Sequence, residues 1–275
     1  MGGCPETGRQ GRFGWQMKYT ALSAFYDSLM EVDYDRWLRY VRKAVARYGL
    51  KPKRVLDLAC GSGEMTIRLA RLGMDVTGVD ASCHMLAVAE AKLRDAGFAC
   101  LFIQQDMRQL ELQDTYDLVI CCCDSLNYIL SPRALKRVFK RVSNCLRPGG
   151  LFILDLNTDY KLANVYGNSS YGVNAPDVSY ILETCYDPST KICQMDLTMF
   201  LPEDGRYLKV EENHRQRAYS TRFITRALTR AGLQPMTVHD DYRFRSPRKR
   251  SERLVFAAAR LASPSSGSGG CGPTV

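Results

Sequence analysis

The sequence predicts an α/β protein with a doubly wound, mostly parallel sheet of seven strands and a small antiparallel β insertion after the fifth strand. Two observations carry this prediction. Between residues 54 and 156, short apolar runs alternate with segments of helical period, which is typical of strands joined by right-handed helical crossovers. After Asn157 the alternation stops, and three strand-like segments follow one another directly.

Apolar runs that end at glycine or aspartate predict the five strands of the first part. They are residues 54–59, 74–79, 99–103, 116–122 and 151–156. The fourth run is continuous and apolar, as a parallel strand buried on both faces requires. Apolar side chains at helical spacing predict helices between the runs, with serine caps and glycine stops at their ends. The predicted helices are residues 64–72, 82–96 and 131–146.

The predicted insertion spans about residues 158–219. Two turns rich in Asp, Pro, Ser and Gly, at residues 187–190 and 202–205, separate its strands. The predicted strands are residues 179–186, 192–201 and 207–219. Beyond the insertion the pattern predicts one more helix at residues 220–231 and two final strands at residues 233–240 and 254–259.

The two ends of the chain differ in composition from the rest. Residues 1–16 and 263–275 are rich in Gly and polar residues and have no apolar period, which predicts a disordered extension and a disordered tail around one domain at residues 17–262. No apolar run reaches the roughly 18 residues of a membrane span, and the first residues lack the apolar segment of a secretory signal. These features predict a cytoplasmic protein without a membrane partner.

Cysteine usage and charge narrow the function classes further. The eleven cysteines include the consecutive Cys121–Cys123 and no Cys-x-x-Cys pair, which favours reduced core thiols and predicts no metal site. The net charge of +9 gathers partly at residues 133–147 and 243–253. A solvated basic face explains this charge, and attraction to RNA or an acidic substrate is the alternative. Aromatic residues are not interleaved with the basic run, so we do not expect a nucleic-acid surface.

Acidic residues and glycines stand where the predicted strands end, at the edge where open parallel sheets bind ligands. Asp57 lies inside the end of the first strand, and the turn Cys60–Gly63 follows it. Asp80 stands at the end of the second strand and Asp106 near the end of the third. Glycines allow a tight turn and let a ligand approach the backbone. A dinucleotide fingerprint would have its third glycine where Thr66 stands, and Asp57 would repel a pyrophosphate. The acids therefore favour a cationic ligand over NAD.

Five motifs together carry a family resemblance. VLDLACGSG, GVDAS, QDM, YDLVICCCDSLNY and LRPGGLFILDLN stand in the order and spacing of class I methyltransferases that use S-adenosylmethionine (SAM). With the segment Phe25-Tyr26-Asp27 and the insertion, the chain resembles their small-molecule branch, which includes amino-sugar N-methyltransferases and glycine N-methyltransferase-like enzymes. The resemblance implies a Rossmann-like fold, SAM as the cofactor and a small molecule as the methyl acceptor.

The resemblance also implies which residues hold the methionine part of SAM. Tyr26, Gly61 and Gly63 would contact it, and Asp57 would lie near its amino group. Simpler roles stay open at two of these positions, because Tyr26 could pack in the core and Asp57 could cap a helix.

The remaining cofactor contacts follow from the later motifs. Asp80 would hold the ribose, and Asp106 with Met107 would lie against the adenine, although a helix cap, a loop acid and a core methionine are the alternatives. The backbone around Cys123 would border the sulfonium, at a position where many relatives carry a bulky apolar or aromatic residue. Four neighbours complete the expected cofactor site, namely Ala59, Cys60, Ala81 and Met85.

Because SAM brings an activated methyl group, the expected task of the protein is in-line placement, which alone can lower a barrier by roughly 7–11 kcal/mol. A hydroxyl or a protonated amine would also need a base. His214 is the candidate base, since period-two counting puts it on the apolar face of the last insertion strand, although a bulge would reverse that parity. We expect Tyr128 to shape the acceptor pocket, and His84 and His239 to have structural roles.

The sequence thus predicts a SAM-dependent methyltransferase that acts on a nitrogen or oxygen atom of a small molecule, as a monomer or homodimer. The alternative is an RNA or protein methyltransferase that uses the same SAM site and a basic docking surface. A non-catalytic SAM-binding protein and an NAD oxidoreductase are further alternatives, the latter disfavoured by Thr66 and Asp57.

Overall fold

The computed structural model describes residues 32–174, 178–203 and 205–261. The predictions for residues 1–16, for residues 263–275 and for Tyr26 concern positions outside the described residues. All statements below refer to the described part of the chain.

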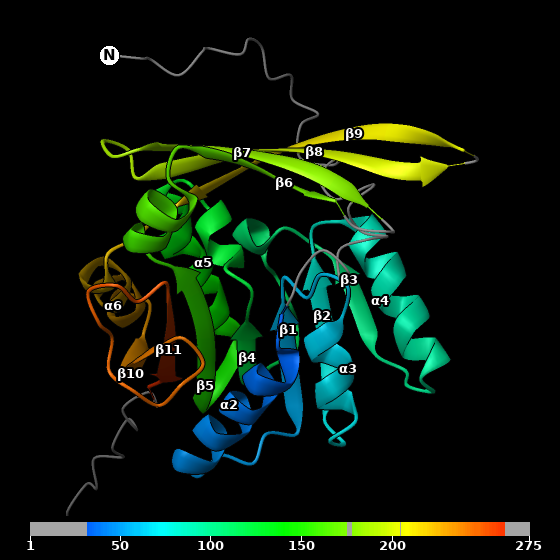
Figure 1. Ribbon diagram of the computed structural model, residues 1–275. Coiled ribbons are helices and arrows are strands. Elements are labelled where there is room, and N and C mark those ends of the chain that lie inside the picture. Colours follow the sequence, from blue (N-terminus) through cyan, green and yellow to red (C-terminus); the bar gives the residue numbers. More distant parts are fainter. Residues whose placement is uncertain (1–31, 175–177, 204, 262–275) are drawn as a thin grey trace, which may run out of the picture.

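A seven-stranded sheet forms the centre of the molecule, in the order β10-β11-β5-β4-β1-β2-β3 (Figure 1). Five strands are parallel neighbours, and β11 runs antiparallel to both β5 and β10. The predicted doubly wound α/β class is therefore confirmed. The strands are β1 (Arg54–Leu58), β2 (Asp75–Asp80), β3 (Leu101–Gln104), β4 (Tyr116–Cys121), β5 (Leu146–Asn157), β10 (Leu233–Asp240) and β11 (Arg253–Arg260).

The strand order fixes where a ligand can bind. From β1 the chain moves outward to β2 and β3, then crosses back to β4 on the other side of β1. The helices that follow β1 and β4 therefore leave the sheet on opposite faces, which opens a crevice at the carboxyl ends of these two strands. Asp57 lies near the end of β1, and Cys123 directly follows β4 at the same edge.

Helices cover both faces of the sheet. Buried side chains of α2 and α3 pack with Val55, Leu118 and Ile153 on one face, and those of α5 and α6 pack with Leu56, Val119 and Phe152 on the other. Side-chain hydroxyls of Ser82 and Ser131 accept the predicted capping hydrogen bonds. The helices are α2 (Tyr34–Arg47), α3 (Glu64–Ala70), α4 (Cys83–Asp95), α5 (Pro132–Cys145) and α6 (Thr221–Arg230), with short turns η1 (Met107–Gln109), η2 (Ser125–Tyr128) and η3 (Lys161–Tyr166).

A second, antiparallel sheet of four strands lies across the carboxyl edge of the central sheet (Figure 1). Its strands are β6 (Ser169–Asn174), β7 (Ser179–Asp187), β8 (Ile192–Glu203) and β9 (Arg206–Arg217). The sequence predicted three of them and missed β6, whose six residues are all exposed and include only two large apolar side chains, Tyr171 and Val173. Pairing from β7 through β9 has no register shift, so period-two counting along β9 holds.

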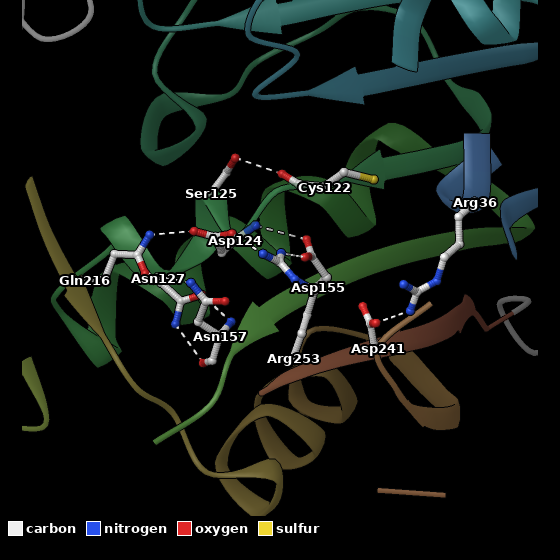
Figure 2. A network of polar contacts seen from close by, with 10 residues as sticks. All are labelled: Arg36, Cys122, Asp124, Ser125, Asn127, Asp155, Asn157, Gln216, Asp241 and Arg253. Atoms are coloured by element: carbon white, nitrogen blue, oxygen red, sulfur yellow. Dashed lines mark hydrogen bonds and ion pairs between the residues drawn. The ribbon is translucent and has the colours of Figure 1, made fainter. Parts of the chain in front are cut away.

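A buried charge cluster joins the two sheets, and we call it the Arg253 cluster (Figure 2). The Arg253 guanidinium of β11 pairs with Asp155 of β5 and, at 2.6 Å, with Asp124 after β4. The Gln216 amide of β9 donates to Asp124 Oδ2 at 2.5 Å. The amide of Asn157 on β5 donates in turn to Gln216 Oε1 at 2.9 Å. The Gln216 side chain therefore links β9 to the central sheet, and the positive charge of Arg253 compensates the two carboxylates buried beside it.

Asn127 of η2 extends this connection. Its side-chain amide donates to the carbonyl oxygens of Asn157 at 3.0 Å and Arg217 at 2.9 Å, and its own oxygen accepts from the Asn157 backbone at 2.9 Å. One fully buried side chain thus satisfies backbone groups of both sheets.

No helix among the described residues is both long enough and apolar enough to cross a membrane. The cytoplasmic location stays a prediction from the sequence.

Replacing Arg253 by Met should lower the free energy of unfolding by about 3–5 kcal/mol, because two buried carboxylates would lose their cation. Urea denaturation measures this change. Arg250→Met is the matched control: Arg250 is exposed in the adjoining loop, and its replacement should change stability by at most ~0.5 kcal/mol. Equal stabilities of the two variants would contradict a structural role for the Arg253 cluster.

Candidate active site

A cavity of about 420 Å³ lies between the carboxyl edge of the central sheet and the inner face of the second sheet. This volume falls in the range of about 300–1,000 Å³ that is typical of small-molecule sites. Strand ends and turns form one wall, and side chains of β7, β8 and β9 form the opposite wall. The fold therefore gives one continuous space with an acidic side and an aromatic side.

The turn after β1 opens room for a ligand. Ala59, Cys60 and Gly61 line the cavity, and Ala59 and Gly61 have positive φ angles of 59° and 54°. A Cβ built on Gly61 meets no atom within 4 Å, so the glycine leaves open space at the cavity wall. Gly63 does not line the cavity. Its φ is 79°, and a Cβ there would stand 2.9 Å from the Cβ of Ala89, so this glycine is needed for helix packing.

Asp80 at the end of β2 is held by two backbone amides. Gly61 N donates to its Oδ2 and Ser82 N to its Oδ1, both at 2.9 Å. Burial raises the pKa of Asp80, while these amides oppose the rise. The carboxylate lines the cavity in a fixed orientation and retains acceptor capacity for two hydroxyl groups.

Asp57 is the most deeply buried acid of the cavity, with 2% of its surface exposed. Thr66 Oγ1 donates a hydrogen bond to its Oδ2 at 2.7 Å. Burial raises the pKa of Asp57 to about 7, with Thr66 opposing this shift and the nearby Asp80 carboxylate adding to it. Thr66, the residue that breaks the dinucleotide fingerprint, thus serves to fix this carboxyl group.

Asp106 and Met107 line the cavity beside η1. Asp106 Oδ1 accepts from Arg108 N at 2.8 Å, and its Oδ2 accepts from Arg108 Nε at 2.8 Å. Burial alone would raise the pKa of Asp106, but the hydrogen bonds and the charge of Arg108 outweigh it and lower the pKa. This carboxylate is therefore ionised and positioned by its own neighbour.

The turn after β4 brings backbone strain to the centre of the cavity. Cys123 and Asp124 are consecutive non-glycine residues with φ angles of 61° and 49°, and both line the cavity. Such residues cost of order 1–3 kcal/mol each and persist only where the surroundings fix them. Here the Asp124 amide donates to Asp155 Oδ1 at 3.1 Å, and the Arg253 cluster holds the Asp124 carboxylate.

His214 of β9 faces the cavity, as the parity of its strand predicted. Its ring centroid lies 6.0 Å from that of Tyr128 in an edge-to-face arrangement. Its Nε2 lies 3.0 Å from Oε2 of Glu212, another largely buried side chain on the same face of β9. The two catalytic candidates named from the sequence, His214 and Tyr128, thus lie next to each other at the same cavity.

Several cavity residues were not found from the sequence. Besides Tyr128, five aromatic side chains line it, namely Tyr34, Trp37, Tyr166, Tyr171 and Tyr180. They come from α2, η3, β6 and β7, segments without a motif of their own. Trp37 and Tyr34 stand on an amphipathic helix whose apolar period could have indicated burial but not a site.

Besides Gly63, three positions considered from the sequence lie away from the cavity. Met85 is 2% exposed, does not line the cavity and is one of the buried side chains of α4. His239 Nδ1 is 2.8 Å from the hydroxyl of Tyr40, outside the cavity, and exposed His84 does not line it either. Ala81 does line it, as expected.

Comparison with known proteins places this arrangement in a family. A sequence profile described as a methyltransferase domain matches residues 55–150. A candidate methyltransferase of Geobacillus sp. (strain WCH70) is 36% identical over 248 residues, which cover 89% of this chain and 100% of the relative. A SAM-dependent methyltransferase from Clostridium acetobutylicum is 32% identical with a TM-score of 0.83, covering 89% of this chain and 99% of that chain. The chain is a class I SAM-dependent methyltransferase.

The family membership makes SAM the cofactor and sets aside the oxidoreductase alternative. The fold also matches the crystal structure of a sugar N-methyltransferase from a Streptoalloteichus species, with 21% identity, a TM-score of 0.74 and coverage of 94% of this chain and 100% of that chain. The site of this methyltransferase fits the cofactor, because buried acids and an open glycine turn meet at one cavity.

Asp80→Ala should weaken SAM binding by at least tenfold, about 1.4 kcal/mol, because we expect this carboxylate, held by the Gly61 amide, to accept hydrogen bonds from the ribose hydroxyls. Isothermal titration calorimetry measures the affinity. Asp114→Ala is the control, since this exposed acid pairs with Arg54 outside the cavity and its loss should leave SAM affinity unchanged. Unchanged affinity of Asp80→Ala would reject the ribose assignment.

Asp57→Asn should stabilise the protein without ligand at pH 8, and the gain should shrink as the pH falls below 7 and vanish only near pH 4. The pKa of Asp57 is raised from 3.8 to about 7 by folding, so the stability linked to its protonation is full below pH 4 and is lost progressively as the pH rises to 7. Asparagine does not ionise, so the variant avoids this loss while its side chain still accepts from Thr66. Thermal unfolding from pH 4 to 8 measures the difference. A variant no more stable than the wild type at pH 8 would show that Asp57 carries no burial penalty.

Proposed function

We propose that this methyltransferase transfers the methyl group of SAM to a nitrogen or oxygen atom of a small molecule bound beneath the second sheet. The observation that carries the proposal is that one cavity, of about 420 Å³, is lined both by the acids at the strand ends and by His214 with a group of tyrosines. The second sheet covers the carboxyl edge of the central sheet and limits the size of what can enter. A solved structure with the same fold is named a sugar N-methyltransferase, which agrees with a small acceptor.

The proposed binding mode assigns each end of SAM to one part of the cavity. Asp80 would accept the ribose hydroxyls, and Asp106 with Met107 would lie against the adenine. The turn with Ala59, Cys60 and Gly61 would lie along the methionine part, with Asp57 near the amino group. A cationic amino group favours the ionised form of Asp57 and so offsets part of the penalty for burying that carboxylate. Tyr26, Gly63 and Met85 enter this assignment only through the resemblance.

SAM supplies a methyl group already activated by the sulfonium, so the protein's residues act by placement and proton transfer. The strained turn at Cys123 borders the space between the acids and the second sheet, which is where the methyl group would be transferred. Tyr128 and the neighbouring tyrosines exclude water and orient the acceptor. Bound SAM would supply the methyl group to the acceptor atom and would leave as S-adenosylhomocysteine, and His214 would take the proton that the acceptor gives up.

Glu212 is the residue that makes His214 suitable as the base. Its carboxylate lies 3.0 Å from His214 Nε2, and both side chains are nearly buried. A carboxylate at this distance stabilises the imidazolium that forms when His214 takes a proton and holds the ring in one orientation. Glu212 is therefore a positioning residue in this proposal.

His214→Ala should lower kcat about 10²-fold and leave SAM affinity unchanged, because the base acts on the acceptor rather than on the cofactor. Glu212→Gln should lower kcat less than His214→Ala does, since a neutral neighbour stabilises the imidazolium less but leaves the base in place. Calorimetry and steady-state kinetics measure these effects. His84→Ala, which changes an exposed histidine outside the cavity, is the control. Full activity of His214→Ala would remove the base from the mechanism.

The acceptor class is tested by methyl transfer from labelled SAM to panels of amines, sugars, phenols, RNA and protein. The proposal expects incorporation into small molecules alone. Incorporation into RNA or protein at a comparable rate would instead favour the alternative in which the basic surface docks a macromolecule. The oligomeric state, monomer or homodimer, stays a prediction.

A further inference from the structure

A second cavity, of about 510 Å³, lies behind the Arg253 cluster, where the loop between β10 and β11 meets the start of η3. Six basic and three acidic side chains line it. Arg253 belongs to this lining and also pairs with Asp124, which lines the first cavity. One ion pair, drawn in Figure 2, therefore joins a residue of the second cavity to a residue of the first.

Most of the acids of the second cavity are already neutralised. Asp240 pairs with Arg245 at 2.6 Å, and Asp241 pairs with Arg36 of α2. The charge of Arg253 is matched by the Asp124 and Asp155 carboxylates. These pairs leave Glu252 as the one acid of the lining, among the described residues, for which the structure shows no ion pair.

Four cations of the lining exceed what Glu252 can balance. Within residues 32–174, 178–203 and 205–261, no carboxylate lies in ion-pair distance of Lys161, Arg243, Arg248 or Arg250. Like charges that converge on a concavity raise the local potential and attract an anion. The four cations exceed Glu252 by three positive charges, and the second carboxylate beside Arg253 reduces this excess to two, which matches a ligand with more than one negative charge.

Lys161 shows the effect most clearly. Its ammonium lies over the ring of Tyr166, 5.2 Å from the ring centroid, in a cation–π contact. Burial lowers the pKa of Lys161, and the charge of Arg253 lowers it further. An anion in the second cavity would relieve this repulsion and favour the charged lysine.

The loop that carries the arginines is held in place. Thr158 Oγ1 donates to the Ser251 carbonyl oxygen at 2.7 Å, and its amide donates to the Glu252 carbonyl oxygen at 3.0 Å. Ser251 Oγ accepts from Arg248 N at 2.8 Å, which closes the turn. Because these hydrogen bonds fix the loop backbone at residues 248–252, ligand binding would order only the arginine side chains.

We propose that this second cavity binds a small anion that carries phosphate groups. Guanidinium groups match phosphate oxygens with paired hydrogen bonds, and several arginines converge here on one concave surface. The shape favours a compact ligand over a nucleic-acid strand. The aromatic residue of the same loop, Phe244, stacks on Tyr40 with ring centroids 4.7 Å apart and so is engaged within the protein rather than offered to a base.

Titration of the full-length protein with inorganic pyrophosphate tests the proposal. The wild type should bind pyrophosphate, and the double variant Arg248→Ala/Arg250→Ala should bind it at least tenfold more weakly while its SAM affinity is unchanged. The matched control is Arg226→Ala/Arg230→Ala, which removes two exposed arginines from α6 and lowers the net charge equally but lies outside the second cavity.

Three results would overturn the proposal. The first is a wild type that binds no pyrophosphate. The second is an equal loss of binding in the α6 control, which would mean attraction by net charge alone. The third is that a single-stranded RNA binds the wild type much more tightly than pyrophosphate does and that the same double variant no longer binds it. This result would assign the surface to nucleic acid. Each result is independent of whether the first cavity transfers methyl groups.

Discussion

The Arg253 guanidinium compensates two buried carboxylates, and the position of the second sheet depends on this interaction. Asp124 belongs to the strained segment after β4, and Asp155 of β5 accepts a hydrogen bond from the Asp124 amide. Both carboxylates pair with Arg253. Gln216 binds Asp124 from β9, two residues from His214. The proposed base and the turn that borders the methyl group are therefore positioned by the same charges. An isolated buried ion pair adds little stability, but one that fixes two sheets gives the site a defined geometry.

A second constraint is the placement of acids where a cation must bind. Asp57 is buried at a cost in stability when it is ionised, and its raised pKa records that cost. Asp80 differs because two backbone amides offset its burial, and Asp106 differs because Arg108 does. Of the three acids, Asp57 thus gains most from a positive partner. This is the expected behaviour of a site whose native ligand carries a sulfonium and an amino group.

The positions of the strand-end acids could be predicted because they follow from topology. Apolar runs define the parallel strands, parallel strands share one carboxyl edge, and residues that follow them meet there. The inward face of His214 was also predictable, since β9 keeps its period without a bulge. The motif resemblance correctly indicated the family and its cofactor.

Other parts could not be read from the sequence for physical reasons. β6 was missed because it has only two large apolar side chains, Tyr171 and Val173, in a strand of six exposed residues. Arg253 ends a basic run, and only its tertiary neighbours show that its guanidinium lies between two buried carboxylates, while Arg243, Arg248 and Arg250 are exposed. Gly63 is a glycine of the cofactor motif, yet the structure requires glycine there because Ala89 lies too close for a Cβ. The aromatic wall comes from four separate segments whose convergence depends on the fold.

The central claim is that one cavity holds SAM along the strand-end acids and the acceptor against the second sheet. A crystal structure with S-adenosylhomocysteine tests it most directly. The account predicts ribose hydroxyls on Asp80, the amino-acid part along Gly61 and the sulfur directed past Cys123 toward His214 and Tyr128. A ligand bound outside this cavity, or one whose sulfur points away from the second sheet, would contradict it.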